Sequence, residues 1–222
     1  MPNVEIIGGA RSTYTRVARM VCEEKAIAYE LKDAAPRSTG AFAIHPFGKI
    51  PVMRHGDFEL CESKAIATYL DLNFPGPRLI PTEPRQAALT EQWVSLVNTR
   101  IDTTMIRTYL FAYIFPKTED GKPDRKAIDA LAPAVEQEIG LLDRTVAKGG
   151  FLAGDSFTYA DINLVPILFY VRQLPEGAAA MAAAKPLSDY YARLAARPSF
   201  QNTMPPPGPP PRLDKAAIKT AG

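Results

Sequence analysis

The sequence predicts two domains, a small α/β layer followed by an all-helical domain. Short strand and helix patterns alternate in the first third of the chain, and only helical patterns follow. The 222 residues suffice for two small domains, and a cluster of four prolines between Pro75 and Pro84 separates the two patterns. We therefore expect an α/β domain at 1–78, a linker at 79–85, a helical domain at 86–204 and a proline-rich tail at 205–222.

Composition and charge exclude several classes of protein. Hydrophobic residues make up 46% of the chain and charged residues 23%, which is typical of a globular protein with a core. The net charge of +2 gives no strong field to hold nucleic acid or an anionic membrane. No apolar stretch has the roughly 18 residues of a membrane span, and the N-terminal pattern is not that of a signal peptide. Two cysteines and two histidines favour a reducing cytoplasm and no metal site.

The first domain is expected to open with a βαβ unit. Val4 and Ile6 alternate with polar neighbours and predict a short strand. Apolar residues then recur at helical spacing up to Glu24, and residues 28–31 predict a second strand. A strand, a helix and a strand of this size form a right-handed βαβ unit.

A ββα unit is expected after an irregular stretch at 33–49. Residues 51–53 and 58–60 predict two strands, which a hairpin turn joins. Ser63 is expected to cap a helix that follows, because serine is a preferred residue at that position.

The second domain is expected to hold long helices. Pro166 predicts a kink in one of them. The expected helices cover about 86–115, 125–148, the residues after Thr158, and about 187–196. Thr158 and Asp161 have the spacing of a capping box, which gives Asp161 a structural role.

Ser12 lies at the junction of the first strand and the first helix. A serine there can simply cap the helix. Alternatively, its hydroxyl and the positive helix start can stabilise a bound thiolate and lower the pKa of that thiol. A drop of two pKa units corresponds to about 2.7 kcal/mol, and the thiolate is the nucleophilic form.

Two further segments each have a structural and a functional interpretation. Pro51 can begin an edge strand in the ordinary way, or a cis bond after Ile50 can leave the Ile50 backbone free to pair with an extended peptide. Glu62 and Ser63 can be a plain helix start, or they can hold a zwitterionic amino-acid end. In that case the helix start takes a carboxylate and Glu62 takes an ammonium group.

Together these segments resemble the glutathione transferase superfamily. Residues 45–52 read His-Pro-Phe-Gly-Lys-Ile-Pro-Val, which is similar to the family's Asn-Pro-Phe-Gly-Gln/Lys-Val/Ile-Pro. Residues 62–70 resemble its Glu-Ser-x-Ala-Ile-x-x-Tyr-Leu motif, and residues 152–161 resemble its folding motif in the second domain. Residues 12–30 resemble its first βαβ segment more weakly, and the whole resemblance covers about 3–200.

The resemblance implies a thioredoxin-like first domain that binds glutathione. By position, Ser12 would activate the glutathione thiol, and Ile50 before a cis Pro51 would pair with the cysteinyl backbone. Lys49 would lie near the glycyl end. Glu62 and Ser63 would hold the γ-glutamyl end.

The resemblance also implies a hydrophobic electrophile as second substrate and a homodimer. The electrophile would lie against the long helix that carries Arg107, Tyr109 and Tyr113. The helices that begin near Ser63 and Gln86 carry more apolar residues than two small domains need, which favours a symmetric dimer.

Some positions depart from the family's pattern. Thr13 replaces the usual proline after the serine, and His45 replaces the usual asparagine, so Tyr14 is a rival to Ser12 as activating hydroxyl. No cysteine stands at position 12, which argues against the branch that forms mixed disulfides. The sequence leaves two alternatives open: a non-catalytic binding module on the same fold, and a glutathione-dependent peroxidase or reductase.

Overall fold

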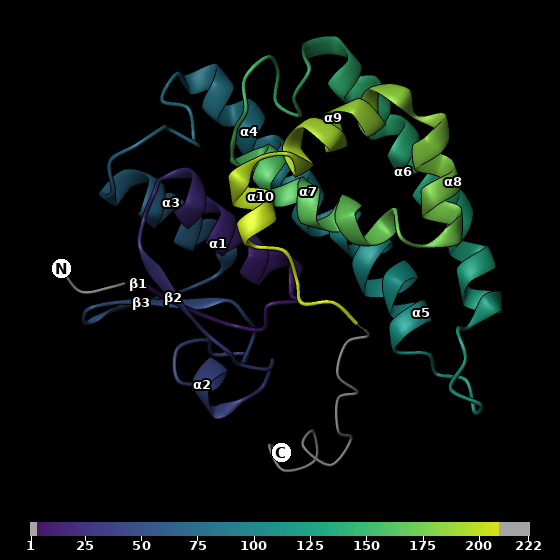
Figure 1. The fold of residues 1–222 in the computed structure, drawn as a ribbon, viewed down its shortest axis with the longest axis horizontal. Helices are drawn as coiled ribbons and strands as arrows, with labels where there is room; N and C mark the ends of the chain where they lie inside the picture. The colour runs from purple at the N-terminus through teal and green to yellow at the C-terminus, as the bar shows by residue number, and fades with distance from the viewer. Residues whose placement is uncertain (1–3, 209–222) are drawn as a thin grey trace. The chain divides into compact units, whose positions relative to one another are not determined.

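The computed structural model describes residues 4–208, and these fall into two compact units. The first unit contains the residues up to Pro77 together with those from Pro198 onward. The second unit is Arg78–Arg197. Figure 1 gives the labels of their helices and strands.

The first unit is built on a four-stranded mixed sheet in the order β2-β1-β3-β4. Strand β1 pairs with β2 in parallel and with β3 in antiparallel fashion, and β3 pairs antiparallel with β4. Helices α1 and α3 pack against each other over one face, and α2 lies on the other side (Figure 1). The bounds are β1 Val4–Ile7, α1 Thr13–Glu24, β2 Tyr29–Lys32, α2 Thr39–Phe42, β3 Val52–His55, β4 Phe58–Cys61 and α3 Ser63–Asn73. This confirms the expected βαβ and ββα order and the thioredoxin-like first domain.

Alternation along β1 separates the core from the outer face of the sheet. Val4 and Ile6 are buried, and Ile6 lies opposite Met53 in the neighbouring strand. Glu5 points to the other face, where it forms an ion pair with Arg54. The period of two in the sequence therefore places the helices over the apolar face.

A buried ion pair joins the two helices that cover the sheet. Lys25, at the end of α1, places its Nζ 3.1 Å from Oδ1 of Asp71 in α3, and both side chains are almost fully buried. The same Nζ donates to the carbonyl oxygen of Pro77 at 3.1 Å. The two bonds hold α1, α3 and the end of the first unit together.

Helix α10, Pro198–Asn202, belongs to the first unit, although the sequence placed residues 86–204 in one helical domain. Buried Arg16 donates to the Phe200 carbonyl oxygen at 3.0 Å, and its guanidinium lies 3.9 Å from the centre of the Phe200 ring. Arg19 donates to the Asn202 carbonyl oxygen at 3.2 Å. These contacts with α1 are long-range, so helical periodicity alone does not predict them. Of the expected proline-rich tail, residues 209–222 lie outside the described residues.

The second unit consists of helices, as expected. The helix predicted at 86–115 is one run from α4 through α5, and its middle makes i→i+5 turns. The bounds are α4 Pro84–Leu96, η1 Val97–Ile101, η2 Thr103–Leu110, α5 Phe111–Ile114, α6 Arg125–Gly149, α7 Tyr159–Val171, α8 Pro175–Ala183 and α9 Lys185–Ala195. Helix α8 was not predicted, because its alanine-rich sequence has no apolar periodicity.

No helix among residues 4–208 is long and apolar enough to cross a membrane.

The predicted capping box at the start of α7 is confirmed. Asp161 is fully buried and accepts hydrogen bonds from the backbone N–H groups of Thr158 and Leu152 at 2.8 and 2.9 Å. The Tyr190 hydroxyl donates to the same carboxylate at 2.9 Å. Asp161 therefore joins the start of α7 to α9 and to the preceding loop.

Asp161→Ala is expected to destabilise the protein by about 3 kcal/mol or more, because it leaves several buried donors without an acceptor. Denaturant unfolding of the variant measures this cost. Asp155→Ala, in the same loop but exposed, is the matched control and should stay near wild type. Equal stability of the two variants would refute the structural role of Asp161.

Candidate functional site

The register of the sheet brings three of the predicted segments to one edge. Ile7 at the end of β1 lies opposite Val52 at the start of β3, and Val52 lies opposite Cys61 at the end of β4. The segment after Ile7 leads to Ser12, the residue before Val52 is Pro51, and the residue after Cys61 is Glu62. Segments that are far apart in the sequence therefore meet at the same end of the sheet.

Ser12 is the cap of α1, as its structural interpretation predicted. Its Oγ accepts the backbone N–H of Thr15 at 3.3 Å, and the residue is half-buried. That bond uses an oxygen lone pair, so the hydroxyl hydrogen can still be donated to an anion. Tyr14 is also half-buried, in the first turn of the same helix, and stays the alternative donor.

The loop before β3 contains a tight turn and a cis bond. The Gly48 N–H donates to the His45 carbonyl oxygen at 2.9 Å, which places Pro46 at the second position of the turn, a favoured place for proline. Gly48 has φ of +61°, and a Cβ there would come within 2.8 Å of the Phe42 ring. The Ile50–Pro51 peptide bond is cis.

The backbone of Ile50 is not paired with the described strands of the sheet. Within residues 4–208, its N–H and C=O take part in no backbone hydrogen bond. Lys49 beside it is exposed. An extended peptide could therefore pair with position 50 as an additional strand does.

The corner between β4 and α3 corrects one prediction. Ser63 was expected to cap α3, but the cap is Glu62, and Ser63 is the first residue of the helix. The reason is that Glu62 adopts φ of +70°, which turns the chain so that the Glu62 carbonyl oxygen accepts the Ile66 N–H at 2.9 Å. A positive φ is rare for glutamate and strains the backbone, which points to a functional site.

The start of α3 has unused hydrogen-bonding capacity. No side chain caps it, so its first N–H groups are not satisfied by a side chain. Ser63 is only 7% exposed, and within the described residues its hydroxyl makes no hydrogen bond. The positive end of a helix with a hydroxyl beside it suits a carboxylate.

His45 is a residue of this site that the sequence did not identify as functional. Its ring is buried, with Nε2 3.1 Å from Oε1 of Glu62, and its Nδ1 accepts the Phe47 N–H at 3.0 Å. The available signal was its place at the head of a turn, where a side-chain acceptor commonly binds the N–H two residues on.

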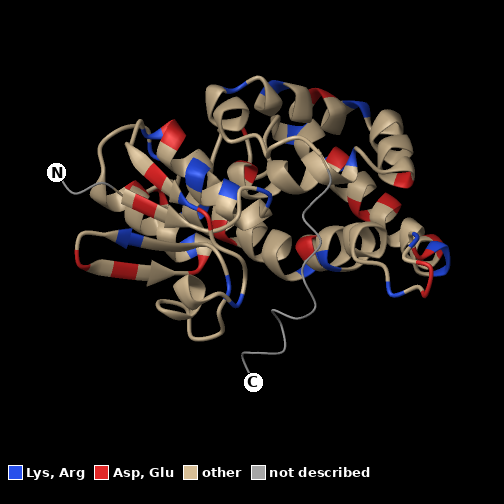
Figure 2. Cartoon of the chain, turned by 60° about the horizontal axis from the view of Figure 1, so that its bottom comes forward, with Lys and Arg blue, Asp and Glu red and all other residues tan. Residues whose placement is uncertain are grey.

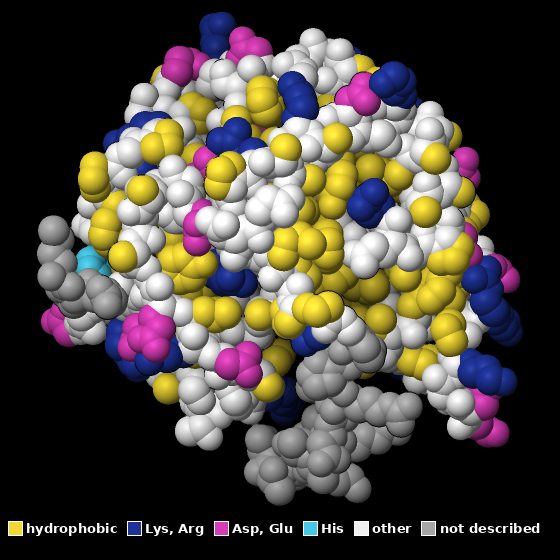
Figure 3. Space-filling model, viewed as in Figure 1, with side chains coloured by type: hydrophobic (Ala, Val, Ile, Leu, Met, Phe, Trp, Pro, Cys, Tyr) yellow, Lys and Arg dark blue, Asp and Glu magenta, His cyan; other side chains and the backbone are white. Residues whose placement is uncertain are grey.

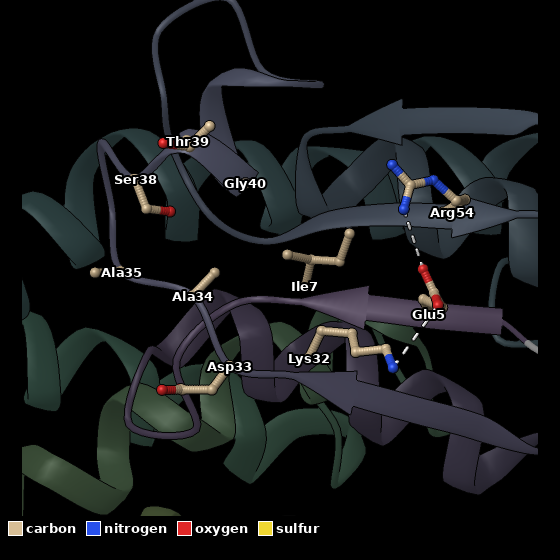
Figure 4. A pocket seen from close by; sticks show the side chains of 10 residues that line it. All are labelled: Glu5, Ile7, Lys32, Asp33, Ala34, Ala35, Ser38, Thr39, Gly40 and Arg54. Atoms are coloured by element: carbon tan, nitrogen blue, oxygen red, sulfur yellow. Dashed lines mark hydrogen bonds and ion pairs between the residues drawn. The ribbon is translucent and has the colours of Figure 1, made fainter.

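A hollow lies on the outer face of the sheet (Figure 4). Ile7 forms part of its floor, and Glu5 lies within ion-pair distance of both Arg54 and Lys32 at one end. None of the predicted site residues lines it. Charges of both signs are interspersed along the described residues in the view of Figure 2.

The residues predicted for an electrophile lie in the second unit. Tyr109 is fully buried, and its hydroxyl donates to Oε2 of Glu176 at 2.7 Å, so it is part of the core. Tyr113 donates to the same oxygen at 2.6 Å and is half-buried. Arg107 is exposed and pairs with Asp102 at 2.9 Å. The structure brings the two tyrosines together, and Arg107 has a different partner.

Glu176 is held in its charged form. Burial by itself raises its pKa, but hydrogen bonds from Tyr113, Tyr109 and Arg125 outweigh this and lower the pKa to about 2. The ordinary value is 4.5. Burial, together with the hydrogen bond to Glu176, raises the pKa of Tyr113.

Because the pKa of Glu176 is lowered in the folded protein, the stability that this residue contributes is lost as the pH falls. The Glu176 contacts should stabilise the protein fully above pH 4.5 and lose this effect as the pH falls toward 2. We expect Glu176→Gln to cost about 1 kcal/mol near pH 6, since a partly exposed cluster is screened by solvent, and less near pH 3. Denaturant unfolding of both proteins at several pH values measures the difference. A gap that stays constant between pH 6 and pH 3 would contradict the assignment.

Comparison with known proteins identifies both units. Residues 7–78 match the family described as glutathione S-transferase, N-terminal domain. Residues 101–198 match the family described as glutathione S-transferase, C-terminal domain. The two matches cover most of the described chain.

Individual proteins give the same result over nearly the whole length. Glutathione S-transferase 3 of Zea mays is 30% identical over 202 residues, which are 86% of this chain and 89% of the relative. A solved structure of glutathione S-transferase III in apo form has a TM-score of 0.79 at 28% identity, covering 93% of this chain and 100% of that one. The theta class glutathione S-transferase of Xanthomonas axonopodis pv. citri, solved with glutathione bound, has a TM-score of 0.77 at 25% identity, with coverage of 91% and 97%.

Proposed function

Because the chain belongs to the glutathione S-transferase family, we propose that its first unit binds glutathione and that Ser12 activates the bound thiol for attack on a hydrophobic electrophile. The single observation that carries this proposal is the register that brings the segments of Ser12, Pro51 and Glu62 to one edge of the sheet. Glutathione is then a co-substrate, and the two free cysteines suit a cytoplasmic enzyme.

The γ-glutamyl end is assigned to the β4–α3 corner. Its α-carboxylate would accept hydrogen bonds from the Ser63 hydroxyl and the first N–H groups of α3, which no side chain caps. Its ammonium group would lie against the Glu62 carboxylate, which is 64% exposed. The negative carboxylate of the ligand thus meets the positive start of α3, and its positive ammonium group meets the negative Glu62.

The rest of the tripeptide is assigned to the loop before β3. The cysteinyl backbone would pair with the N–H and C=O of Ile50, whose place is set by Pro51. The glycyl carboxylate would lie near exposed Lys49. With both ends held, the sulfur is directed to the start of α1.

At the start of α1 the thiol would lose its proton to solvent. The Ser12 hydroxyl would donate a hydrogen bond to the resulting thiolate, and the positive helix end adds to this stabilisation. The thiolate sulfur then forms a bond to an electrophilic carbon. In a substitution the leaving group departs with the electron pair of the broken bond; in an addition the π pair of an activated double bond moves to its electron-withdrawing group and takes up a proton from solvent. Neither step requires an external oxidant or reductant.

The electrophile is assigned to the second unit. Arg107 and Tyr113 stay candidates for contact with the electrophile. Tyr109 is fully buried, so its role is to stabilise the core. On the face shown in Figure 3, apolar side chains gather over the region of α7 and α8. An apolar surface of this kind favours a hydrophobic substrate.

Ser12→Ala is expected to lower turnover roughly thirty-fold, because one directed hydrogen bond to the thiolate contributes about 2 kcal/mol. The pKa of bound glutathione should rise toward its value in water, while glutathione affinity changes little. Ultraviolet titration of the enzyme–glutathione complex measures thiolate directly.

Tyr14→Phe is the matched control for this prediction. We expect its thiolate titration to superimpose on that of wild type. A raised thiol pKa in Tyr14→Phe with an unchanged value in Ser12→Ala would transfer the activating role to Tyr14.

We also propose a symmetric homodimer. Large apolar side chains are exposed on both units, above all Phe47 at 74% and Leu72 at 67%, with Leu89 and Leu96 on α4. Exposed apolar side chains of this size can form part of a protein interface, and a two-fold symmetric dimer is the commonest assembly. Light scattering should give close to twice 24.3 kDa. Phe47→Ser should weaken this dimer, and a wild-type monomer at micromolar concentration would contradict it.

A further inference from the structure

The hydrogen bonds of His45 determine which ring nitrogen carries its proton. Nδ1 lies 3.0 Å from the backbone N–H of Phe47, so Nδ1 is the acceptor and carries no hydrogen. Nε2 then carries the proton and donates to Oε1 of Glu62 at 3.1 Å. Both ring nitrogens therefore make a hydrogen bond, and the residue is only 2% exposed.

The two bonds join two segments of the site. The bond to Phe47 lies within the turn that leads to Ile50 and Pro51, and the bond to Glu62 reaches the corner before α3. An asparagine at position 45 could accept the Phe47 N–H with its amide oxygen, as in an Asx-turn. Its side chain is too short to reach Glu62 as well. Histidine therefore adds one contact that asparagine cannot make.

We infer that His45 is a positioning residue that holds the Glu62 carboxylate in place for the ammonium group of bound glutathione. This inference rests on the proposed function and assigns a role to a residue that does not itself touch the substrate. The substrate feature that it recognises, through Glu62, is a free α-ammonium group.

The exposure of Glu62 makes such support necessary. Its side chain is 64% exposed, so without a partner it would sample several rotamers in water. Ordering a free glutamate side chain when a ligand binds costs conformational entropy. The strained backbone at φ of +70° fixes the base of this side chain, and the hydrogen bond from buried His45 fixes its carboxylate end. The carboxylate is thereby ordered before the ligand arrives.

The test uses His45→Asn, which keeps the turn and removes the Glu62 contact. Glutathione binding is measured by calorimetry against wild type, with a second ligand, glutaryl-cysteinylglycine, in which the ammonium group is absent. We expect His45→Asn to bind glutathione about tenfold more weakly, as for the loss of one hydrogen bond to a charged group. For glutaryl-cysteinylglycine, the two proteins should bind equally.

Steady-state kinetics and melting separate positioning from general damage. In His45→Asn, KM for glutathione should rise about tenfold while kcat at saturation changes less than about twofold. Melting temperature should stay near wild type, because the Phe47 bond is retained. His45→Gln, whose longer side chain can donate toward Glu62, should recover part of the lost affinity.

The outcomes distinguish this inference from the proposed function. If wild type binds no glutathione, the proposed function fails. If wild type binds it and His45→Asn binds both ligands as wild type does, the positioning role is refuted. An equal loss for both ligands in His45→Asn would also overturn it, because the effect would then be independent of the ammonium group.

Discussion

The candidate site depends on the register that aligns the ends of three strands. One row of paired residues crosses β1, β3 and β4 and consists of Ile7, Val52 and Cys61. Strands β1 and β4 end at this row and β3 begins there, so three loops meet beside it. A shift of one residue in either pairing would turn apolar side chains to the other face of the sheet and move Pro51 or Glu62 out of place. The buried side chains of Ile6 and Met53 fix this register through the core. The same burial that stabilises the sheet therefore positions the site.

Two helix starts give this edge its chemistry, and they are used differently. Helix α1 is capped by Ser12, whose hydroxyl hydrogen can still be donated. Helix α3 has no side-chain cap, and the strained residue Glu62 precedes it. Both helix ends favour negative charge. A zwitterionic tripeptide with a reactive thiol matches this pair, because its carboxylate and its thiolate are both anions and its ammonium group can be paired by Glu62.

Local patterns in the sequence predicted most of the fold. Alternation at Val4 and Ile6, the hairpin between residues 51–53 and 58–60, and the Thr158–Asp161 spacing are local signals, and each corresponds to an observed element. Long-range contacts could not be predicted in this way. The attachment of α10 to α1 depends on Arg16, and the bond between His45 and Glu62 spans 17 positions in the sequence. The left-handed backbone of Glu62, which displaced the cap from Ser63, follows from tertiary structure and has no glycine to signal it.

The central claim is that the γ-glutamyl end of glutathione is bound at the start of α3. Calorimetric titration with glutathione and with cysteinylglycine, which keeps the thiol and lacks the γ-glutamyl group, tests it most directly. The account predicts a saturable isotherm for glutathione and no measurable binding of cysteinylglycine at the same concentrations. In Ser63→Ala the glutathione isotherm should weaken toward that of cysteinylglycine. Equal binding of the two ligands by wild type would contradict the account.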